Sequence, residues 1–75
     1  MAGLRRMKIK LRIREICEQQ GRSRTWLSHR AEIQYDTVSG IWHNPNRDVS
    51  IVTLLKIARA LNVNVNDLYE VLPDE

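Results

Sequence analysis

The sequence predicts a small all-α domain, and three observations lead to that class. Apolar residues recur with the period of a helix over residues 50–61, where Ser50 is a suitable N-cap. A second helical pattern covers residues 13–20 and is followed by Gly21, a residue typical of helix C-caps. Between them, two further short helical segments flank a turn at residues 32–34. We expect these helices to share one core.

The length and the cysteine content bound the kind of protein. The chain has 75 residues, enough for one domain with a modest core, so we expect a partner to add stability. A single cysteine, Cys17, cannot form an internal disulfide or a cysteine-based zinc cluster, and it fits a reducing cytoplasm. No apolar run approaches the roughly 20 residues that span a bilayer, and Arg5 and Arg6 precede no signal-peptide core. These features predict a cytoplasmic module without a membrane segment.

The net charge is +3, and the charged residues are unevenly placed. Most cations come early in the chain: Arg5, Arg6, Lys8, Lys10, Arg12, Arg14, Arg22 and Arg24. Several acids lie near the end: Asp67, Glu70, Asp74 and Glu75. This asymmetry favours one side that faces a polyanion and another that is solvated or faces a subunit. Because small soluble domains are often mildly basic, charge alone does not decide for nucleic acid.

The two chain ends flank the expected helices. Residues 1–7 are interpreted as a flexible leader, residues 8–72 as the domain and residues 73–75 as a tail. Lys8–Ile13 alternates apolar and cationic residues, a pattern typical of a half-buried strand, although one helix from Met7 onward is an alternative. If Tyr69–Leu72 is also extended, it can pair with this strand as a small antiparallel ribbon.

Residues 23–43 are predicted to form two short helices joined by a tight turn. Ser23 is the expected N-cap of the first helix. Ile33 is the apolar residue of the turn and should pack back between the helices. The second helix covers about residues 35–43, with a buried stripe of Val38, Ile41 and Trp42. Because its other face is polar, the pair is a candidate helix-turn-helix.

A loop of turn-forming residues at 44–48 leads to the longest predicted helix. Its expected broad apolar face comprises Val52, Leu54, Leu55, Ile57, Ala58 and Leu61. Asn64 and Asp67 have the spacing of a capping box, which predicts a last short helix with Leu68 facing inward.

The sequence offers no support for catalysis. His29 and His43 lie on different predicted helices without an acidic neighbour at ligand spacing, and Cys17 lies on an apolar helical face. No glycine-rich phosphate loop is present. We expect no enzymatic activity, no metal, no cofactor and no small-molecule substrate.

Two long stretches, RIREICEQQG at 12–21 and TLLKIARALNVNVNDLYE at 53–70, resemble the phage repressor/Cro-type helix-turn-helix family, also called the Xre family. KIKL at 8–11 and LYEVLPDE at 68–75 resemble a subset that opens with a short strand. The resemblance implies a five-helix, lambda-repressor-like domain that is usually dimeric and regulates transcription from operator DNA.

The sequence departs from the family pattern in three ways. Ser28 stands where the family usually has a small residue, often alanine. Glu32 stands where the family has glycine, at a turn position that often takes a positive φ, and it should cost about 1 kcal/mol in strain. Cys17 and Trp42 replace an arginine and a glutamate that form an ion pair in the family. This paired change implies that Cys17 and Trp42 touch.

The resemblance makes the second helix of the motif a recognition helix, whose N-terminal residues reach base edges in the major groove. The base contacts expected from this position are Gln34, Tyr35, Asp36 and Ser39. Each has an alternative interpretation as part of a solvated helix face. For Asp36 that alternative is strengthened because an acid in the first turn already stabilises the helix dipole.

Phosphate contacts are expected to fix the register and to supply most of the affinity. The candidates are Arg22, Arg24, Thr25, His43, Asn44 and Arg47. Arg22 is equally well interpreted as a simple surface charge, and Lys8, Lys10 and Arg12 as residues that solubilise a strand edge.

The predicted function is a sequence-specific regulator, a repressor by resemblance, that acts as a homodimer on a two-fold operator in double-stranded DNA. Tyr69, Val71 and Leu72 are the expected dimer surface. The main alternative is a protein-interaction module of the same fold, such as an antitoxin-like partner, in which Glu32 and Asp36 weaken DNA binding. A third hypothesis is non-specific nucleic-acid binding through the basic N-terminal residues.

Overall fold

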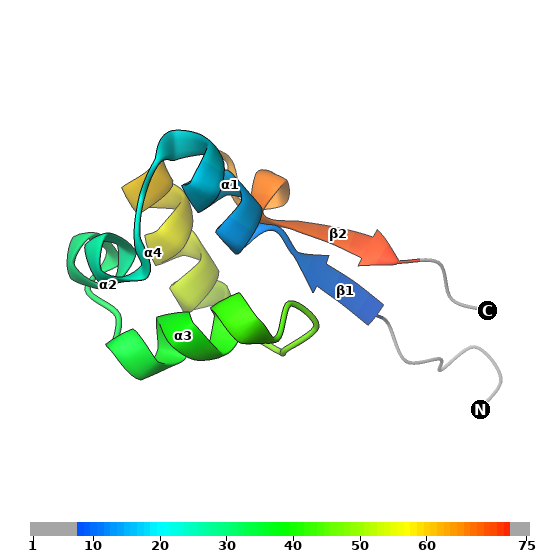
Figure 1. Ribbon diagram of the computed structural model, residues 1–75. Helices are drawn as coiled ribbons and strands as arrows, with labels where there is room; N and C mark the ends of the chain where they lie inside the picture. The colour runs from blue at the N-terminus through cyan, green and yellow to red at the C-terminus, as the bar shows by residue number, and fades with distance from the viewer. Residues whose placement is uncertain (1–7, 73–75) are drawn as a thin grey trace, which may run out of the picture.

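The computed structural model describes residues 8–72. Four α-helices pack together, and the two ends of this range form a short ribbon that projects from them (Figure 1). The expected leader at 1–7 and tail at 73–75 lie outside the described residues. The order of elements is β1 (Lys8–Leu11), α1 (Ile13–Gln20), α2 (Arg24–Ala31), α3 (Tyr35–His43), α4 (Ile51–Leu61), η1 (Val65–Leu68) and β2 (Tyr69–Leu72).

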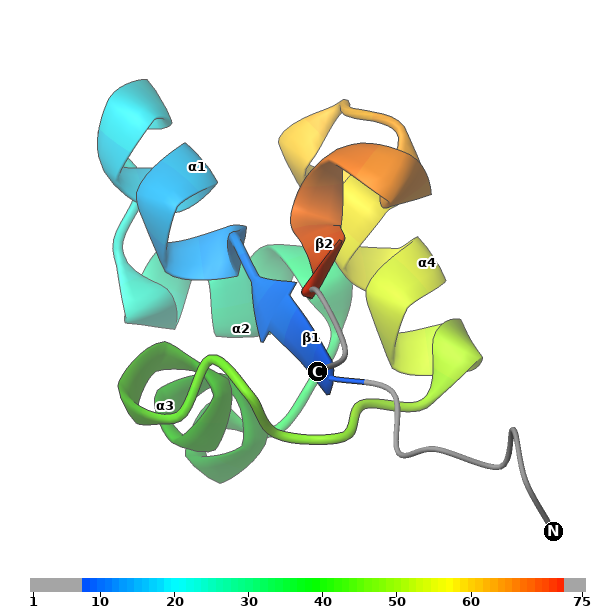
Figure 2. The ribbon, with the colours of Figure 1, turned by 90° about the vertical axis from the view of Figure 1, so that its right-hand side faces the viewer.

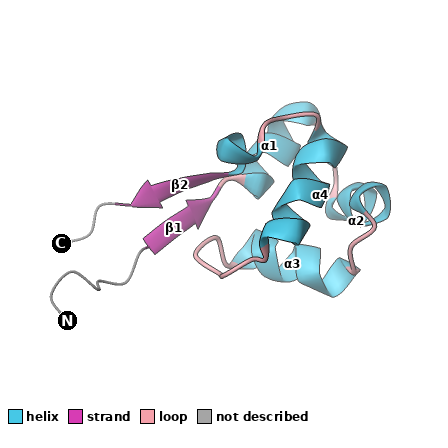
Figure 3. Ribbon diagram, turned by 180° about the vertical axis from the view of Figure 1, so that it is seen from behind, coloured by secondary structure: helices cyan, strands magenta, loops and turns pink. Residues whose placement is uncertain are grey.

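The ribbon confirms the prediction that the ends of the domain pair. β1 and β2 are antiparallel, with Lys8 opposite Leu72 and Leu11 opposite Tyr69. Within the described residues, they form a sheet of two strands. The ribbon extends away from the helices, and its outer end is the part farthest from α2 (Figures 1 and 3).

The helix boundaries follow from their caps. α1 ends at Gly21, which adopts the left-handed conformation at φ 69°. Ser23 caps α2 by accepting a hydrogen bond from the Trp26 amide at 3.0 Å, and Ser50 caps α4 through the Thr53 amide at 3.1 Å. These caps confirm the helices predicted there.

The expectation of five helices is wrong. After α4 the chain makes a single 3₁₀ turn, η1, instead of a fifth α-helix, so the described part of the chain has four. Asp67 accepts a hydrogen bond from the Asn64 amide at 3.3 Å, as the predicted capping box requires. The turn cannot lengthen into an α-helix because Tyr69 already enters β2.

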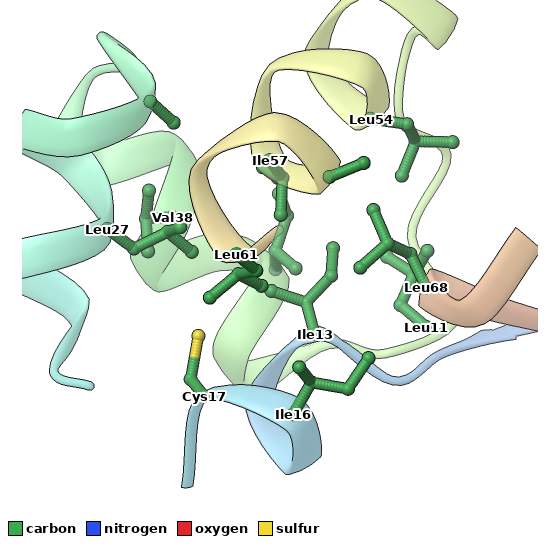
Figure 4. Packing of buried hydrophobic residues seen from close by; sticks show 13 residues of the cluster. Leu11, Ile13, Ile16, Cys17, Leu27, Val38, Leu54, Ile57, Leu61 and Leu68 are labelled. Atoms are coloured by element: carbon green, nitrogen blue, oxygen red, sulfur yellow. The ribbon is translucent and has the colours of Figure 1, made fainter. Parts of the chain in front are cut away.

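The core lies where α1, α3 and α4 meet, with Leu27 of α2 and Leu68 of η1 closing its sides (Figure 4). Seen along the ribbon, α1 and α4 lie on opposite sides of the domain, and β1 runs between them (Figure 2). The fully buried large side chains are Ile13, Cys17, Leu27, Val38, Ile57, Leu61 and Leu68. This core anchors one face of α3 and leaves its other face outside.

The predicted apolar face of α4 is too broad. Its buried residues are Leu54, Ile57, Ala58 and Leu61, which follow the spacing of one helical stripe. Val52 and Leu55 are 58% and 52% exposed. They lie to one side of that stripe, where no neighbouring element of the described domain covers them completely. With Ile51, which is 62% exposed, they form an apolar surface on α4.

Candidate nucleic-acid interface

The turn between α2 and α3 is built from an unusual residue in a strained conformation. Glu32 has φ 58° and ψ 48°, the left-handed conformation that glycine adopts most easily. Its backbone amide bonds to His29 O at 3.4 Å and so completes the last turn of α2. The strained glutamate expected at this position is therefore confirmed.

Ser28 gives this turn a support that the sequence did not reveal. Its side chain is buried, and Oγ donates a hydrogen bond to the carbonyl oxygen of Ile33 at 2.6 Å. The backbone amide of Ile33 in turn donates to Ser28 O at 3.0 Å. Serine therefore joins the end of α2 to the start of α3, which an alanine could not do.

Three of the four expected base-contacting residues form an exposed edge at the N-terminus of α3. Gln34, Tyr35 and Asp36 are all exposed, and Tyr35 retains 42% of its surface. Gln34 is the N-cap residue, but its side chain makes no capping bond within residues 8–72. Its amide is therefore free to bond an external group.

Ser39, the fourth expected base contact, lies deeper than the others. It is half-buried, and its Oγ is 3.4 Å from Nη1 of Arg24, which donates a hydrogen bond from α2. The Arg24 guanidinium is also 5.9 Å from the ring centres of both Tyr35 and Trp42. Arg24 therefore lies across α3, close to the exposed edge, where its guanidinium contacts the Ser39 hydroxyl and faces two aromatic rings.

Arg22 is held by a different aromatic residue. Its guanidinium lies 4.3 Å from the ring centre of Trp26, one turn into α2. Arg22 and Thr25 are exposed and flank Arg24 at the start of α2. The N-terminus of α2 thus brings two arginines to one end of the motif.

The end of α3 and the loop after it hold the remaining residues that are expected to contact phosphate. His43 Nδ1 lies 2.8 Å from Ser39 O, and Asn44 Oδ1 accepts a hydrogen bond from the Asn46 amide at 3.3 Å. The Arg47 side chain folds back over Gly40 so closely that a Cβ added there would overlap its guanidinium. The absence of a side chain at Gly40 therefore makes room for Arg47.

The described residues contain no group of three or more His, Cys, Asp and Glu side chains that could hold a metal ion. Within the same range, no helix has the length and apolar character needed to cross a membrane. Burial raises the pKa of the Cys17 thiol to about 11, so this group stays protonated inside the core.

The inferred contact between Cys17 and Trp42 stays a prediction. Cys17 is fully buried in the core, while Trp42 is half-buried and packs against the same cluster. α1 packs on α3, so the two residues come from neighbouring elements.

The helix-turn-helix formed by α2 and α3, together with the surrounding helices, is typical of a DNA-binding domain. Residues 12–74 match the model of the Cro/C1-type HTH DNA-binding domain, and the chain belongs to that family. Among solved structures, the chain is similar to the restriction-modification controller protein C.AhdI from Aeromonas hydrophila. The two are 30% identical, with a TM-score of 0.68 over 75% of this chain and 83% of the other.

A second similar structure is that of a candidate DNA-binding protein from Bacteroides fragilis. It is 26% identical, with a TM-score of 0.70 over 83% of this chain and 98% of the other. No curated protein sequence matches the chain.

Proposed function

We propose that this protein is a sequence-specific DNA-binding transcriptional regulator that works in the cytoplasm as a homodimer and represses from a two-fold operator. The observation that carries the proposal is the exposed polar edge of α3, formed by Gln34, Tyr35 and Asp36, with Arg24 lying against it. Such an edge suits the major groove, where the N-terminal residues of a recognition helix reach the bases.

The residues of this edge have chemically distinct tasks. The free amide of Gln34 can bond the N6 and N7 atoms of an adenine together. Tyr35 can offer its hydroxyl, or its ring edge to a thymine methyl. Asp36 can accept from cytosine N4, and because phosphates repel it, it must face bases. Ser39 contributes through its bond to Arg24 or, after that bond breaks, directly to a base.

Phosphate binding is assigned to the two ends of the motif. Arg22, Arg24 and Thr25 lie at the N-terminus of α2. His43 is the last residue of α3, and Asn44 and Arg47 follow it in the loop. Cations on both sides of α3 would hold the helix in register on the duplex. Two copies with half-sites one helical turn apart, roughly 34 Å, complete the proposed complex.

The test is selection of bound sequences from a random duplex pool, followed by titration of the selected duplex over a range of salt concentrations. The proposal expects a defined sequence and an affinity that falls with salt. Equal affinity for random and selected duplex at physiological salt would reject specific recognition and favour non-specific binding. Gln34→Ala should change the preferred sequence, whereas Arg22→Ala should weaken all duplexes alike.

One observation favours a second candidate function, a protein-interaction module. Ile51, Val52 and Leu55 are all more than half exposed on α4. Val52 and Leu55 also line a groove of about 410 Å³ between α2 and α4, which is flanked by charged residues including Arg30 and Arg59. Absence of duplex binding even at low salt would favour this function.

A further inference from the structure

The groove where α2 and α4 pack against each other has two parts (Figure 3). The first part, of about 410 Å³, is lined by Val52 and Leu55 among others. The second part, of about 790 Å³, includes Trp26 and ends at Asn62. Three residues line both parts: Arg30, Arg59 and Ala60. The two parts therefore form one continuous surface, called here the α2–α4 groove.

The α2–α4 groove combines an apolar strip with an excess of positive charge. Val52 and Leu55 are 58% and 52% exposed. Glu32 is the one acid among the lining residues. Both ion pairs within residues 8–72 are formed by Arg12 and Arg14, outside the groove. Four exposed cations line the groove: Arg22, Arg30, Lys56 and Arg59. Their charges attract an acidic ligand.

The walls of the groove determine which backbone an occupant can have. α2 and α4 use their backbone groups within their own helices, so the groove offers side chains to a ligand. An extended segment would leave its amides and carbonyls without partners, whereas a helix satisfies them internally. The groove follows α4 from Val52 to Asn62, about 15 Å, which suits roughly three helical turns.

The described helices of this chain do not supply the complementary surface. α1 carries two acids, Glu15 and Glu18, and each is paired with an arginine of the same chain. The apolar residues of α1 are buried in the core. α2 and α4 carry no acid, and α3 carries Asp36 alone. A second copy of the described domain is therefore a poor match for the groove.

A nucleic-acid strand matches only half of the surface. Its phosphates would attract the cations, but its polar backbone would leave Val52 and Leu55 without an apolar partner. A ligand that carries both carboxylates and apolar side chains satisfies both halves.

We propose that the α2–α4 groove binds an acidic amphipathic helix of a partner protein. Apolar residues of that helix, spaced i, i+4 and i+7, cover Val52 and Leu55. Carboxylates on its flanks face Arg30, Lys56 and Arg59. This inference goes beyond the regulator of DNA and does not depend on it.

The groove is distinct from the polar edge of α3. Gln34, Tyr35 and Asp36 do not line it, and Arg24 lies against α3. Arg22 is the residue shared between the groove and the expected phosphate contacts. Partner and duplex can therefore bind to one molecule together.

The first experiment lets the protein select its ligand. A library of peptides of about 15 residues, randomised on one face of a helical scaffold, is selected against the full chain and counter-selected against Leu55→Glu. The expected winners carry Asp or Glu beside apolar residues spaced i, i+4 and i+7, and bind in the micromolar range. Winners that are neutral or basic, or the absence of any winner, would overturn the proposal.

The second experiment exchanges charges between the protein and the selected peptide. Arg59→Glu should weaken binding about tenfold or more. A peptide whose acids are replaced by lysine should bind Arg59→Glu better than it binds the wild type. Lys8→Glu makes the same change in net charge on the ribbon, so it should alter the affinity less than about twofold. Equal losses in the two variants would mean that net charge alone attracts the peptide, and would reject a specific groove.

Backbone amide shifts in the wild-type protein locate the bound peptide, and they decide the question if a variant fails to fold. The proposal requires the largest shifts on α2 and α4, and largest shifts elsewhere would contradict it. Displacement of the peptide by a single-stranded oligonucleotide that shifts the same amides would assign the groove to nucleic acid instead. Self-association that Leu55→Glu abolishes would assign it to a second copy.

Duplex binding is measured separately on the same proteins. A chain that selects acidic helices but binds no duplex would leave this inference intact while the proposed function failed. A chain that binds its operator but selects no acidic helix would show the reverse.

Discussion

Nη1 of Arg24 on α2 lies 3.4 Å from Oγ of Ser39 on α3, so the Arg24 side chain connects the first helix of the motif to the second. The guanidinium also approaches the rings of Tyr35 and Trp42, each at 5.9 Å. A residue expected to bind phosphate therefore also orients the surface that is expected to read bases. This connection predicts coupling between the two kinds of contact.

The coupling can be measured with a double-mutant cycle on duplex binding. Arg24→Ala is expected to weaken binding about tenfold or more, and Ser39→Ala less. Because the two side chains touch, the double variant should deviate from additivity by about 0.5–1 kcal/mol. The matched control pairs Ser39→Ala with Arg22→Ala, since Arg22 contacts Trp26 instead. Strict additivity of Arg24 and Ser39 would contradict the coupling.

Gly40→Ala is predicted to separate stability from binding. Alanine favours the interior of α3 by roughly 0.5–1 kcal/mol over glycine, so thermal unfolding should move to a higher temperature. Its Cβ displaces the guanidinium of Arg47, so duplex affinity should fall toward that of Arg47→Ala. The combined variant serves as the control, because Arg47→Ala should add little once Gly40 is replaced. Unchanged affinity of Gly40→Ala would show that Arg47 does not need its folded-back position.

Glu32→Gly is expected to stabilise the fold by about 0.5–1 kcal/mol, because glycine adopts φ 58° without strain. Urea unfolding of the two proteins measures the difference directly. Glu32→Gln keeps the strained backbone and removes only the charge, so it should match the wild type. A stabilisation of equal size in both variants would assign the effect to charge.

Ionisation of Cys17 should make the protein less stable in strong alkali. Burial raises the pKa of this thiol from 9.0 to about 11, so the folded state holds the proton more tightly than the unfolded state. The resulting stability is complete below pH 9 and is lost as the pH rises toward 11. Comparison of the pH dependence of unfolding in wild type and Cys17→Ala isolates this contribution from other alkaline groups. Equal slopes for the two proteins above pH 9 would contradict it.

The fold was largely predictable because its signals are local. The caps Ser23 and Ser50, the left-handed Gly21 and the alternation in Lys8–Leu11 each act within a few residues, and each was interpreted correctly. The error at η1 had a local cause as well. Its capping residues are real, but they begin a single turn that gives way at once to β2.

The errors in α4 and in the details of the site have a different origin. Val52 and Leu55 are apolar residues of a regular helix, and only the positions of other elements decide whether anything covers them. The contact of Arg47 with Gly40 and the bond from Ser28 to Ile33 depend on where side chains meet across a turn or a loop. The periodicity of residues 35–43 predicted the polar edge of α3. Nothing in the sequence indicated that the Arg24 side chain of α2 lies against that edge.

The pairing of Lys8 with Leu72 has a consequence for any longer polypeptide that contains this domain. Adjacent strands in a sheet are separated by about 4.8 Å. A segment fused ahead of Lys8 and another fused behind Leu72 would therefore depart from almost the same point, at the end of the domain remote from α2. Both fused segments would thus be attached at the ribbon. Each would begin at a distance from α2, the first helix of the helix-turn-helix.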